Sequence, residues 1–163
     1  MPSVARKHIN YEIMPRFAKM FKPGDWILFV GVSRPFDDLY KSMFSRSLLE
    51  TIDIKKTNPE PDMLGDISNC PEILDDFYAG VIMIGVYEYL KDRPGAFKEI
   101  YRILKPRGLA LICVPGEGYY HDKPTVKPKD AESVIQPLRL KSMEITYYKS
   151  NIPNYIHLIG EKV

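Results

Sequence analysis

The sequence contains few of the residues that build disulfide frameworks and metal centres. Its 163 residues include two cysteines, Cys70 and Cys113, which are far apart and lie in unrelated contexts. It has no Cys-x-x-Cys pair and no Cys/His spacing typical of a metal site. We therefore expect neither a disulfide framework nor a bound metal, and we expect a reducing, cytoplasmic environment.

Long apolar runs and an excess of one charge are also missing. The longest apolar stretches have the length of a strand, and the N-terminus shows no signal-peptide pattern, so we expect no membrane partner. Lys and Arg number 23 against 21 Asp and Glu, which indicates no clear nucleic-acid footprint and leaves the oligomeric state open. With 45% apolar and 27% charged residues, the chain has the composition and length of a single globular domain, residues 1–163.

Short apolar runs alternate along the chain with helical patterns. This alternation predicts a mainly parallel sheet covered by helices. Strands are predicted at residues 25–30, 47–54, 63–67, 79–85, 109–114, 140–148 and 155–161. Helices are predicted at 4–21 with an interruption at Pro15, at 36–44, at 71–77, from 92 or 93 to a closing turn at 105–108, and at 130–135. The short turn at Pro153-Asn154 predicts a terminal antiparallel hairpin, with one antiparallel strand at the edge of the sheet.

Candidate functional residues follow the predicted strands. In sheets of this kind, ligands bind beyond the carboxyl ends of the strands, where the strand order reverses. The segments at these ends are 31–36, Asp53, Asp66, 85–89 and 115–121.

The order of these segments resembles that of the class I methyltransferases that use S-adenosylmethionine. The best match runs over residues 79–116, where a strand, Tyr87-Glu88-Tyr89, a helix, the turn at 105–108 and another strand follow one another as in that family. The resemblance identifies the chain as a small, type-11-like methyltransferase. It implies a Rossmann-like, doubly wound α/β fold with a seven-stranded mixed sheet, the last strand antiparallel and helices on both faces. It also implies S-adenosylmethionine as cofactor and an unidentified small or medium-sized methyl acceptor.

The same resemblance implies a set of cofactor-binding residues. Asp53, with Ile54, stands where a carboxylate accepts hydrogen bonds from the ribose hydroxyls, and Asp66, with Ile67, stands where the adenine amino group is bound. Gly85 and Val86 correspond to backbone beside the adenosyl and methionine parts, and Gly31, Val32 and Ser33 to the glycine-rich loop. Either aspartate could instead serve only its own turn, because Asp is common in turns at strand ends.

The glycine-rich loop departs from the family pattern. Phe29 stands where the family has an acidic residue, and Ser33 and Pro35 replace the second and third glycines. Without that acid, Glu88 or backbone carbonyls would have to receive the methionine ammonium. The departures motivate an alternative to the active methyltransferase, a catalytically inactive methyltransferase-like module that binds or assembles with a partner. A nicotinamide-dependent enzyme is a weaker alternative, because no G-x-G-x-x-G follows the first strand.

No residue is singled out as catalytic. Methyl transfer from a sulfonium requires alignment of donor and acceptor, and a base where the acceptor is not already nucleophilic. The residues placed to contact an acceptor are 87–89 and Tyr119, Tyr120 and His121, although tyrosines more often serve packing and His121 more often a solvated loop. Residues 1–22 form an N-terminal helical segment, and 117–129 is a candidate lid loop.

Overall fold

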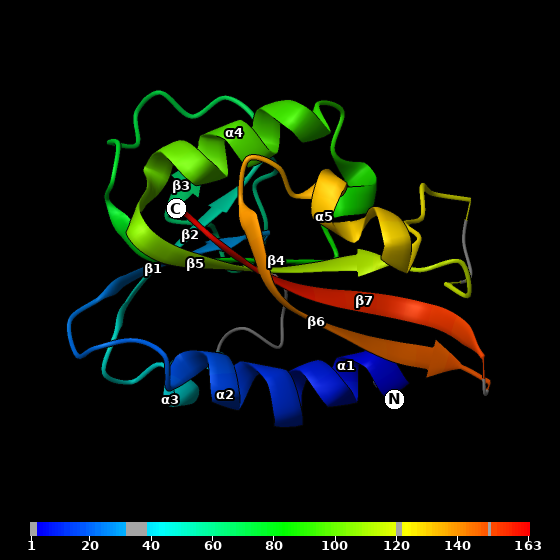
Figure 1. Cartoon of the computed structure of the whole chain (residues 1–163). Helices are drawn as coiled ribbons and strands as arrows, with labels where there is room; N and C mark the ends of the chain where they lie inside the picture. Colours follow the sequence, from blue (N-terminus) through cyan, green and yellow to red (C-terminus); the bar gives the residue numbers. More distant parts are fainter. Residues whose placement is uncertain (1–2, 32–38, 120–121, 150) are drawn as a thin grey trace.

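A seven-stranded sheet forms the middle layer of the protein. The computed structural model describes residues 3–31, 39–119, 122–149 and 151–163. The strand order is β3-β2-β1-β4-β5-β7-β6. Helices α1, α2 and α3 cover one face of the sheet, and α4 and α5 cover the other (Figure 1). The predicted doubly wound α/β arrangement, with helices on both faces of a mixed sheet, is confirmed.

The first five strands are parallel and the last two form an antiparallel hairpin. The strands are β1 (Trp26–Val30), β2 (Leu48–Asp53), β3 (Met63–Leu64), β4 (Tyr78–Ile84), β5 (Leu104–Pro115), β6 (Arg139–Tyr148) and β7 (Ile152–Glu161). The last strand, β7, is antiparallel to both of its neighbours, as predicted. Its predicted place at the edge was wrong, because β7 lies between β5 and β6. The burial explains the order: Ile156 and Leu158 of β7 are fully buried, whereas β6 exposes Arg139 and Lys141, which protect a sheet edge.

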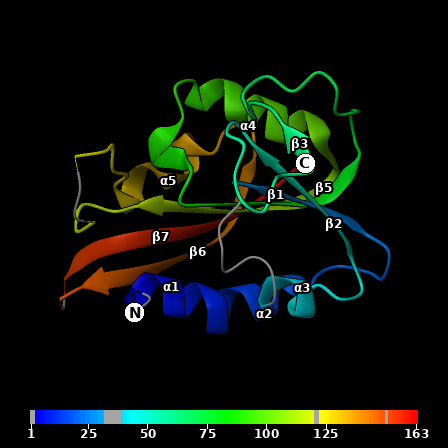
Figure 2. The same cartoon turned by 180° about the vertical axis from the view of Figure 1, so that it is seen from behind.

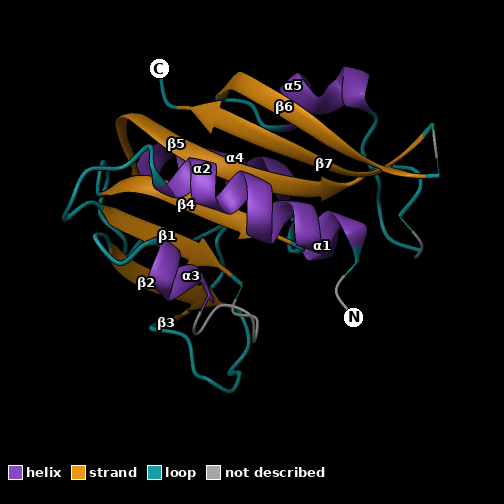
Figure 3. Ribbon diagram, turned by 90° about the horizontal axis from the view of Figure 1, so that it is seen from below, coloured by secondary structure: helices purple, strands orange, loops and turns teal. Residues whose placement is uncertain are grey.

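The N-terminal segment is one continuous helical run. It consists of α1 (Val4–His8), a π turn (Ile9–Ile13) and α2 (Met14–Ala18), and it packs beneath the sheet (Figures 2 and 3). The predicted interruption at Pro15 is instead absorbed by the π turn, in which the Met14 N–H bonds to the Ile9 carbonyl. Proline lacks an N–H and its ring crowds the preceding turn, so a widened turn keeps the chain helical. Of the predicted helix at 36–44, the structure describes α3 (Leu39–Met43).

The opposite face carries α4 (Arg93–Ile103) and α5 (Ala131–Val134), with short 3₁₀ turns at η3 (Tyr87–Tyr89) and η4 (Pro128–Asp130). Asp92 caps α4 by accepting the Gly95 N–H at 3.0 Å. The predicted closing turn at 105–108 belongs instead to β5, which begins at Leu104. Backbone bonds explain this, since the Arg107 N–H donates to Lys162 and the Lys162 N–H donates to Gly108.

The predicted helix at 71–77 was wrong, and Arg102 of α4 gives the reason. Its guanidinium donates to the carbonyls of Cys70 at 3.0 Å and Ile73 at 2.7 Å. In a helix those carbonyls would accept from N–H groups four residues later, so the arginine stabilises a turn in place of a helix. The same guanidinium pairs with Glu99 and Asp75.

Side-chain alternation along β1 divides the core into two clusters. Leu28 and Val30 pack with α4, whereas Ile27 and Phe29 pack with the N-terminal helix and α3. Phe29 stacks on Tyr40 with ring centroids 6.0 Å apart and meets Phe44 edge-on at 5.7 Å. Phe29 is therefore a structural residue of the helix-covered face.

Substituting Arg102 tests whether this one guanidinium stabilises the turn after Cys70. We expect Arg102→Met to lower the free energy of unfolding by roughly 2–4 kcal/mol, because it removes the guanidinium that donates to two carbonyls and pairs with the Glu99 carboxylate. The matched control is Lys98→Met on the same helix, an exposed position where the change should stay within about 0.5 kcal/mol. Urea denaturation measures both, and equal effects would contradict the assignment.

The pH dependence of stability gives an independent check of the Glu99–Arg102 pair. The hydrogen bond from Arg102 lowers the pKa of Glu99 to about 2, from an ordinary value of 4.5. A lowered folded-state pKa stabilises the protein above pH 4.5, and this contribution disappears as the pH falls toward 2. In urea denaturation, the difference in unfolding free energy between wild type and Glu99→Gln should therefore be full at neutral pH and shrink toward pH 2. A difference in unfolding free energy that stays constant with pH would contradict a stabilising Glu99–Arg102 pair.

Candidate functional site

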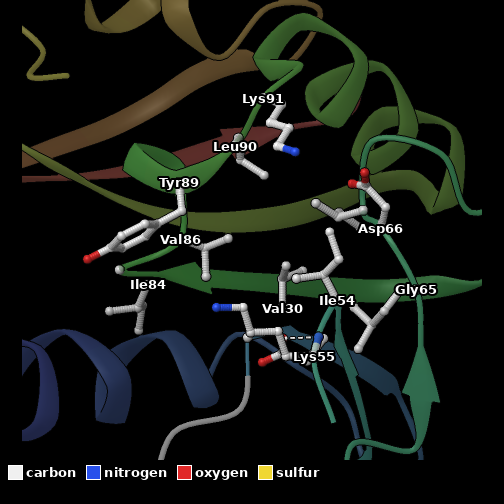
Figure 4. Close-up of a pocket in the computed structure, with 15 residues that line it drawn as sticks. Val30, Ile54, Lys55, Gly65, Asp66, Ile84, Val86, Tyr89, Leu90 and Lys91 are labelled. Atoms are coloured by element: carbon white, nitrogen blue, oxygen red, sulfur yellow. Dashed lines mark hydrogen bonds between the residues drawn. The ribbon is translucent and has the colours of Figure 1, made fainter. Parts of the chain in front are cut away.

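A hollow of about 300 Å³ opens at the carboxyl ends of β1, β2, β3 and β4 (Figure 4). The strand order reverses here, since β1 is followed outward by β2 and β3, and β4 by β5. Folds of this kind bind ligands at this point. The residues lining it are Val30, Gly31, Ile52, Asp53, Ile54, Lys55, Gly65, Asp66, Ile67, Ile84, Gly85, Val86, Tyr89, Leu90 and Lys91.

Two glycines form the floor between β1 and β4. Gly31 and Gly85 have φ values of +81° and +66°, which favour glycine over any residue with a side chain. The Gly31 N–H donates to the Ile52 carbonyl at 2.8 Å, so the bend after β1 is tied to β2. A Cβ at Gly31 would lie 2.6 Å from Cγ2 of Val86. Because Gly31 has no side chain, its bare backbone faces the hollow.

Asp53 ends β2 with its half-buried carboxylate at the hollow. Its Oδ1 accepts the Lys55 N–H at 2.9 Å, which turns the chain away from the sheet (Figure 4). Its carbonyl accepts the Gly65 N–H, which links β2 to the segment after β3. A carboxylate held in this way can accept hydrogen bonds from a pair of hydroxyl groups.

Asp66 and Ile67 line the neighbouring wall. The predicted strand at 63–67 is shorter than expected, because β3 ends at Leu64 and Asp66 instead forms an isolated bridge with Asn69. Oδ1 of Asp66 accepts from the N–H and the hydroxyl of Ser68, at 2.9 and 2.8 Å. The turn role considered for this residue is therefore real, and its exposed carboxylate still borders the hollow.

The structure brings together most of the cofactor-binding residues that the sequence predicts. Those that line the hollow are Gly31, Asp53, Ile54, Asp66, Ile67, Gly85 and Val86. The other two, Val32 and Ser33, lie outside the described residues. The cofactor contacts of all nine remain predictions.

Sequence analysis did not single out Leu90, Lys91 or Lys55, which also line the hollow. Leu90 and Lys91 follow η3 on one side, next to Tyr89, a candidate acceptor contact, and Lys55 lies across from them after β2 (Figure 4). Their closeness in sequence to predicted site residues could have identified them, since Lys55 is two residues past Asp53 and the others follow Gly85 within six residues. The ring of Tyr89 also lies under the Lys123 ammonium, 5.3 Å from its centroid.

The remaining acceptor candidates occupy different surroundings. Tyr87 is buried against Phe97, with the Arg93 guanidinium 5.0 Å from its ring centre, so it serves packing. Glu88 is 4% exposed and does not line the hollow; its Oε1 accepts the Tyr155 hydroxyl at 3.0 Å. Burial, together with the Glu88 charge, raises the pKa of Tyr155. Tyr119 meets the Tyr155 ring edge-on at 4.9 Å.

Two acceptor candidates, Tyr120 and His121, lie outside the described residues. Among the described residues, His157 is a buried histidine that sequence analysis left without a role. It faces the Cys113 sulfur at 3.2 Å and the Thr146 hydroxyl at 3.3 Å, and burial lowers its pKa to about 4. It is therefore a neutral core residue, away from the hollow.

Comparisons with known proteins agree with this geometry. A family profile described as a methyltransferase domain matches residues 34–112, which span Asp53, Asp66 and Gly85. A search of curated proteins with the sequence found no match. In the described part of the chain, no helix is long and apolar enough to cross a membrane.

Solved structures share the fold at low sequence identity. An S-adenosylmethionine-dependent methyltransferase from Archaeoglobus fulgidus aligns with a TM-score of 0.70 at 14% identity, covering 96% of this chain and 94% of that one. One from Methanosarcina mazei aligns with a TM-score of 0.67 at 12% identity, covering 91% and 97%. A putative methyltransferase of Haloferax volcanii, in complex with the Trm112 methyltransferase activator, aligns with a TM-score of 0.64 at 14% identity, covering 96% and 90%. The fold of this chain is therefore that of S-adenosylmethionine-dependent methyltransferases of known structure, and the methyltransferase-domain profile matches the part of it that carries most of the hollow.

Proposed function

We propose that this protein transfers the methyl group of S-adenosylmethionine to a small-molecule acceptor, and that the 300 Å³ hollow holds the adenosine part of the cofactor. The observation that carries the proposal is the meeting of Asp53, Asp66, Gly31 and Gly85 around one hollow at the point where strand order reverses. These residues come from four separate stretches of the chain. In an adenine nucleoside, the ribose has a pair of hydroxyl groups that could donate to Asp53, and the base has an amino group that could donate to Asp66.

The residues of the hollow suit the adenosine part of the cofactor. Asp53 would accept from the ribose hydroxyls, and Asp66 with the Ile67 N–H would bind the adenine edge. Val86, Leu90 and Ile67 supply apolar surface for the base. Gly31 and Gly85 would let the ligand lie against bare backbone. When bound, the cofactor supplies an activated methyl group on a sulfonium.

The acceptor is proposed to enter beyond Gly85, on the side of the N-terminal helix. Tyr155, Tyr119 and Glu88 gather there, and they offer aromatic faces and a carboxylate. Residues 117–129 are proposed to cover this side as a lid, because Lys123 already lies over the Tyr89 ring. Residues 1–163 would then act as a single domain, with 1–22 closing one face.

Alanine at Gly31 tests whether a ligand must approach bare backbone there. Gly24 is the matched control: its φ of +83° is close to the +81° of Gly31, but a Cβ at Gly24 meets nothing within 4 Å. We expect Gly24→Ala to cost about 1–2 kcal/mol of stability through backbone strain alone, with S-adenosylhomocysteine binding unchanged. Gly31→Ala should cost more, because it displaces Val86, and it should weaken binding at least roughly tenfold.

Denaturation and isothermal calorimetry measure the two quantities. Equal ligand affinities in the two glycine variants would contradict a ligand that passes Gly31.

Removing the Asp53 carboxylate tests the proposed function directly. Wild type should bind S-adenosylmethionine and S-adenosylhomocysteine in calorimetry and should not bind NAD. Asp53→Ala should weaken binding by roughly tenfold to a hundredfold, because hydrogen bonds to a charged group are lost. Its fold should persist, since the Asp53 carboxylate bonds to the backbone of an exposed turn.

The control for Asp53 is Glu60→Ala, which removes a carboxylate that is 65% exposed on the connection between β2 and β3. It should bind like wild type. If wild type binds neither S-adenosyl compound at millimolar concentration, the proposal is wrong and an inactive binding module is the better reading.

A further inference from the structure

A second, smaller hollow lies beside Gly31 on the side of the N-terminal helix. It measures about 20 Å³ and is lined by Arg6, Phe29, Val30, Gly31, Tyr40, Ile82 and Ile84. Val30, Gly31 and Ile84 also line the 300 Å³ hollow, so the two adjoin across the ends of β1 and β4. A ligand whose nucleoside fills the larger hollow would extend past Gly31 toward the smaller one.

Arg6 is the charged side chain among the described residues that line this smaller hollow. It is half-buried, and one of its five N–H groups donates to the Tyr40 hydroxyl at 3.4 Å. The Tyr40 hydroxyl in turn donates to Asn10. Within the described part of the chain, no carboxylate forms an ion pair with Arg6. A half-buried guanidinium with donors to spare is suited to an anion.

The other described residues that line this hollow add no negative charge. Phe29 presents an aromatic ring at the position where the family resembled has an acid, and the rest of the described lining is Tyr40, backbone and apolar side chains. The charge of Arg6 also reaches the buried neighbours, since it opposes the rise in pKa that burial imposes on Tyr40 and Cys113. Among the described residues, the charge at this end of the site is therefore positive.

Arg6 is held in place by its own helix. Ser3 caps α1 by accepting the Arg6 N–H at 3.1 Å. Further along the same helical run, two and ten residues after Arg6, His8 and Arg16 both bind the carboxylate of Glu144 on β6, at 3.1 and 2.7 Å. The helical run that carries the guanidinium is thus capped at its start by Ser3 and attached to β6 by two contacts.

We propose that Arg6 forms an anion subsite that takes the carboxylate at the amino-acid end of the cofactor, and that this carboxylate, rather than the ammonium, supplies the affinity at that end. The inference rests on the proposed function, because it needs the adenosine part in the larger hollow. It goes beyond that function by assigning a residue on the N-terminal helix and a charge preference to the site.

The competing arrangement uses Glu88. Its carboxylate could receive the ammonium in place of the acid that Phe29 replaces. However, Glu88 is nearly fully buried, already accepts the Tyr155 hydroxyl, and lines neither hollow. The two arrangements predict opposite ligand preferences.

Four ligands separate the possibilities by calorimetry on the full chain. They are S-adenosylhomocysteine, its deaminated analogue that keeps the carboxylate, its decarboxylated analogue that keeps the ammonium, and methylthioadenosine, which has neither. We expect the carboxylate analogue to bind roughly tenfold or more tightly than the ammonium analogue, as a charge-assisted hydrogen bond to Arg6 requires. Methylthioadenosine should bind weakly through its nucleoside alone.

Variants assign the preference to Arg6. In Arg6→Gln, the two analogues should bind within about threefold of each other. Arg6→Lys should keep part of the preference, since it keeps the charge. Lys7→Gln, which removes an exposed charge from the same helix, should behave like wild type. Thermal melts check that each variant is folded. The four-ligand series on wild type tests the charge preference even without the variants.

The outcomes distinguish this inference from the function on which it rests. If methylthioadenosine binds but wild type prefers the ammonium analogue or shows no preference, the anion subsite is wrong and the adenosine site stands. The same holds if Arg6→Gln keeps the preference while folded. If no ligand of the series binds, both proposals fall together.

Discussion

The reversal of strand order between β1 and β4 is the constraint on which the site depends. Consecutive strands proceed outward from β1 through β2 to β3 and from β4 to β5, so the ends of β1 and β4 border a space that the sheet itself does not fill. Gly31 and Gly85 turn the chain there with positive φ, and neither places a side chain in the space. Connectivity therefore makes the hollow, and the residues after each strand decide what fits it.

The wall beyond β3 has no regular structure of its own, and α4 stabilises it. Arg102 donates to the carbonyls of Cys70 and Ile73, while Glu99 accepts the Cys70 N–H at 3.0 Å. Burial and Glu99 raise the pKa of the Cys70 thiol to about 12, so the thiol stays protonated beside that carboxylate. Since Ile67, three residues before Cys70, lines the hollow, the position of this wall depends on an ion pair on the far side of the turn.

The features that could be predicted from the sequence are those that a local pattern of residues determines. Apolar runs marked the strands, and residues following them in order, such as Asp53 and Gly85, marked the site. Prediction from the sequence failed where distant groups decide the local structure: Arg102, about thirty residues away, prevents a helix after Cys70, and the apolar character of β7 places it inside the sheet. It also missed Arg6, because a basic residue on an amphipathic helix carries no local sign that the fold will bring it beside Gly31.

Phe29 is the main departure from the pattern of the methyltransferases that the chain resembles, because it stands where they have an acidic residue. Alternation along β1 directs this side chain into the cluster of Tyr40 and Phe44, where an unpaired carboxylate would be costly to bury. An aromatic residue there attaches the N-terminal helix and α3 to the sheet, but it removes a negative charge from the end of β1. Among the described residues that line this end of the site, the charged side chain is Arg6, on a helix that Glu144 holds against β6. If Arg6 binds the amino-acid end of the ligand, that contact comes from a helix rather than from the first strand, so cofactor affinity depends on how firmly the helix is docked.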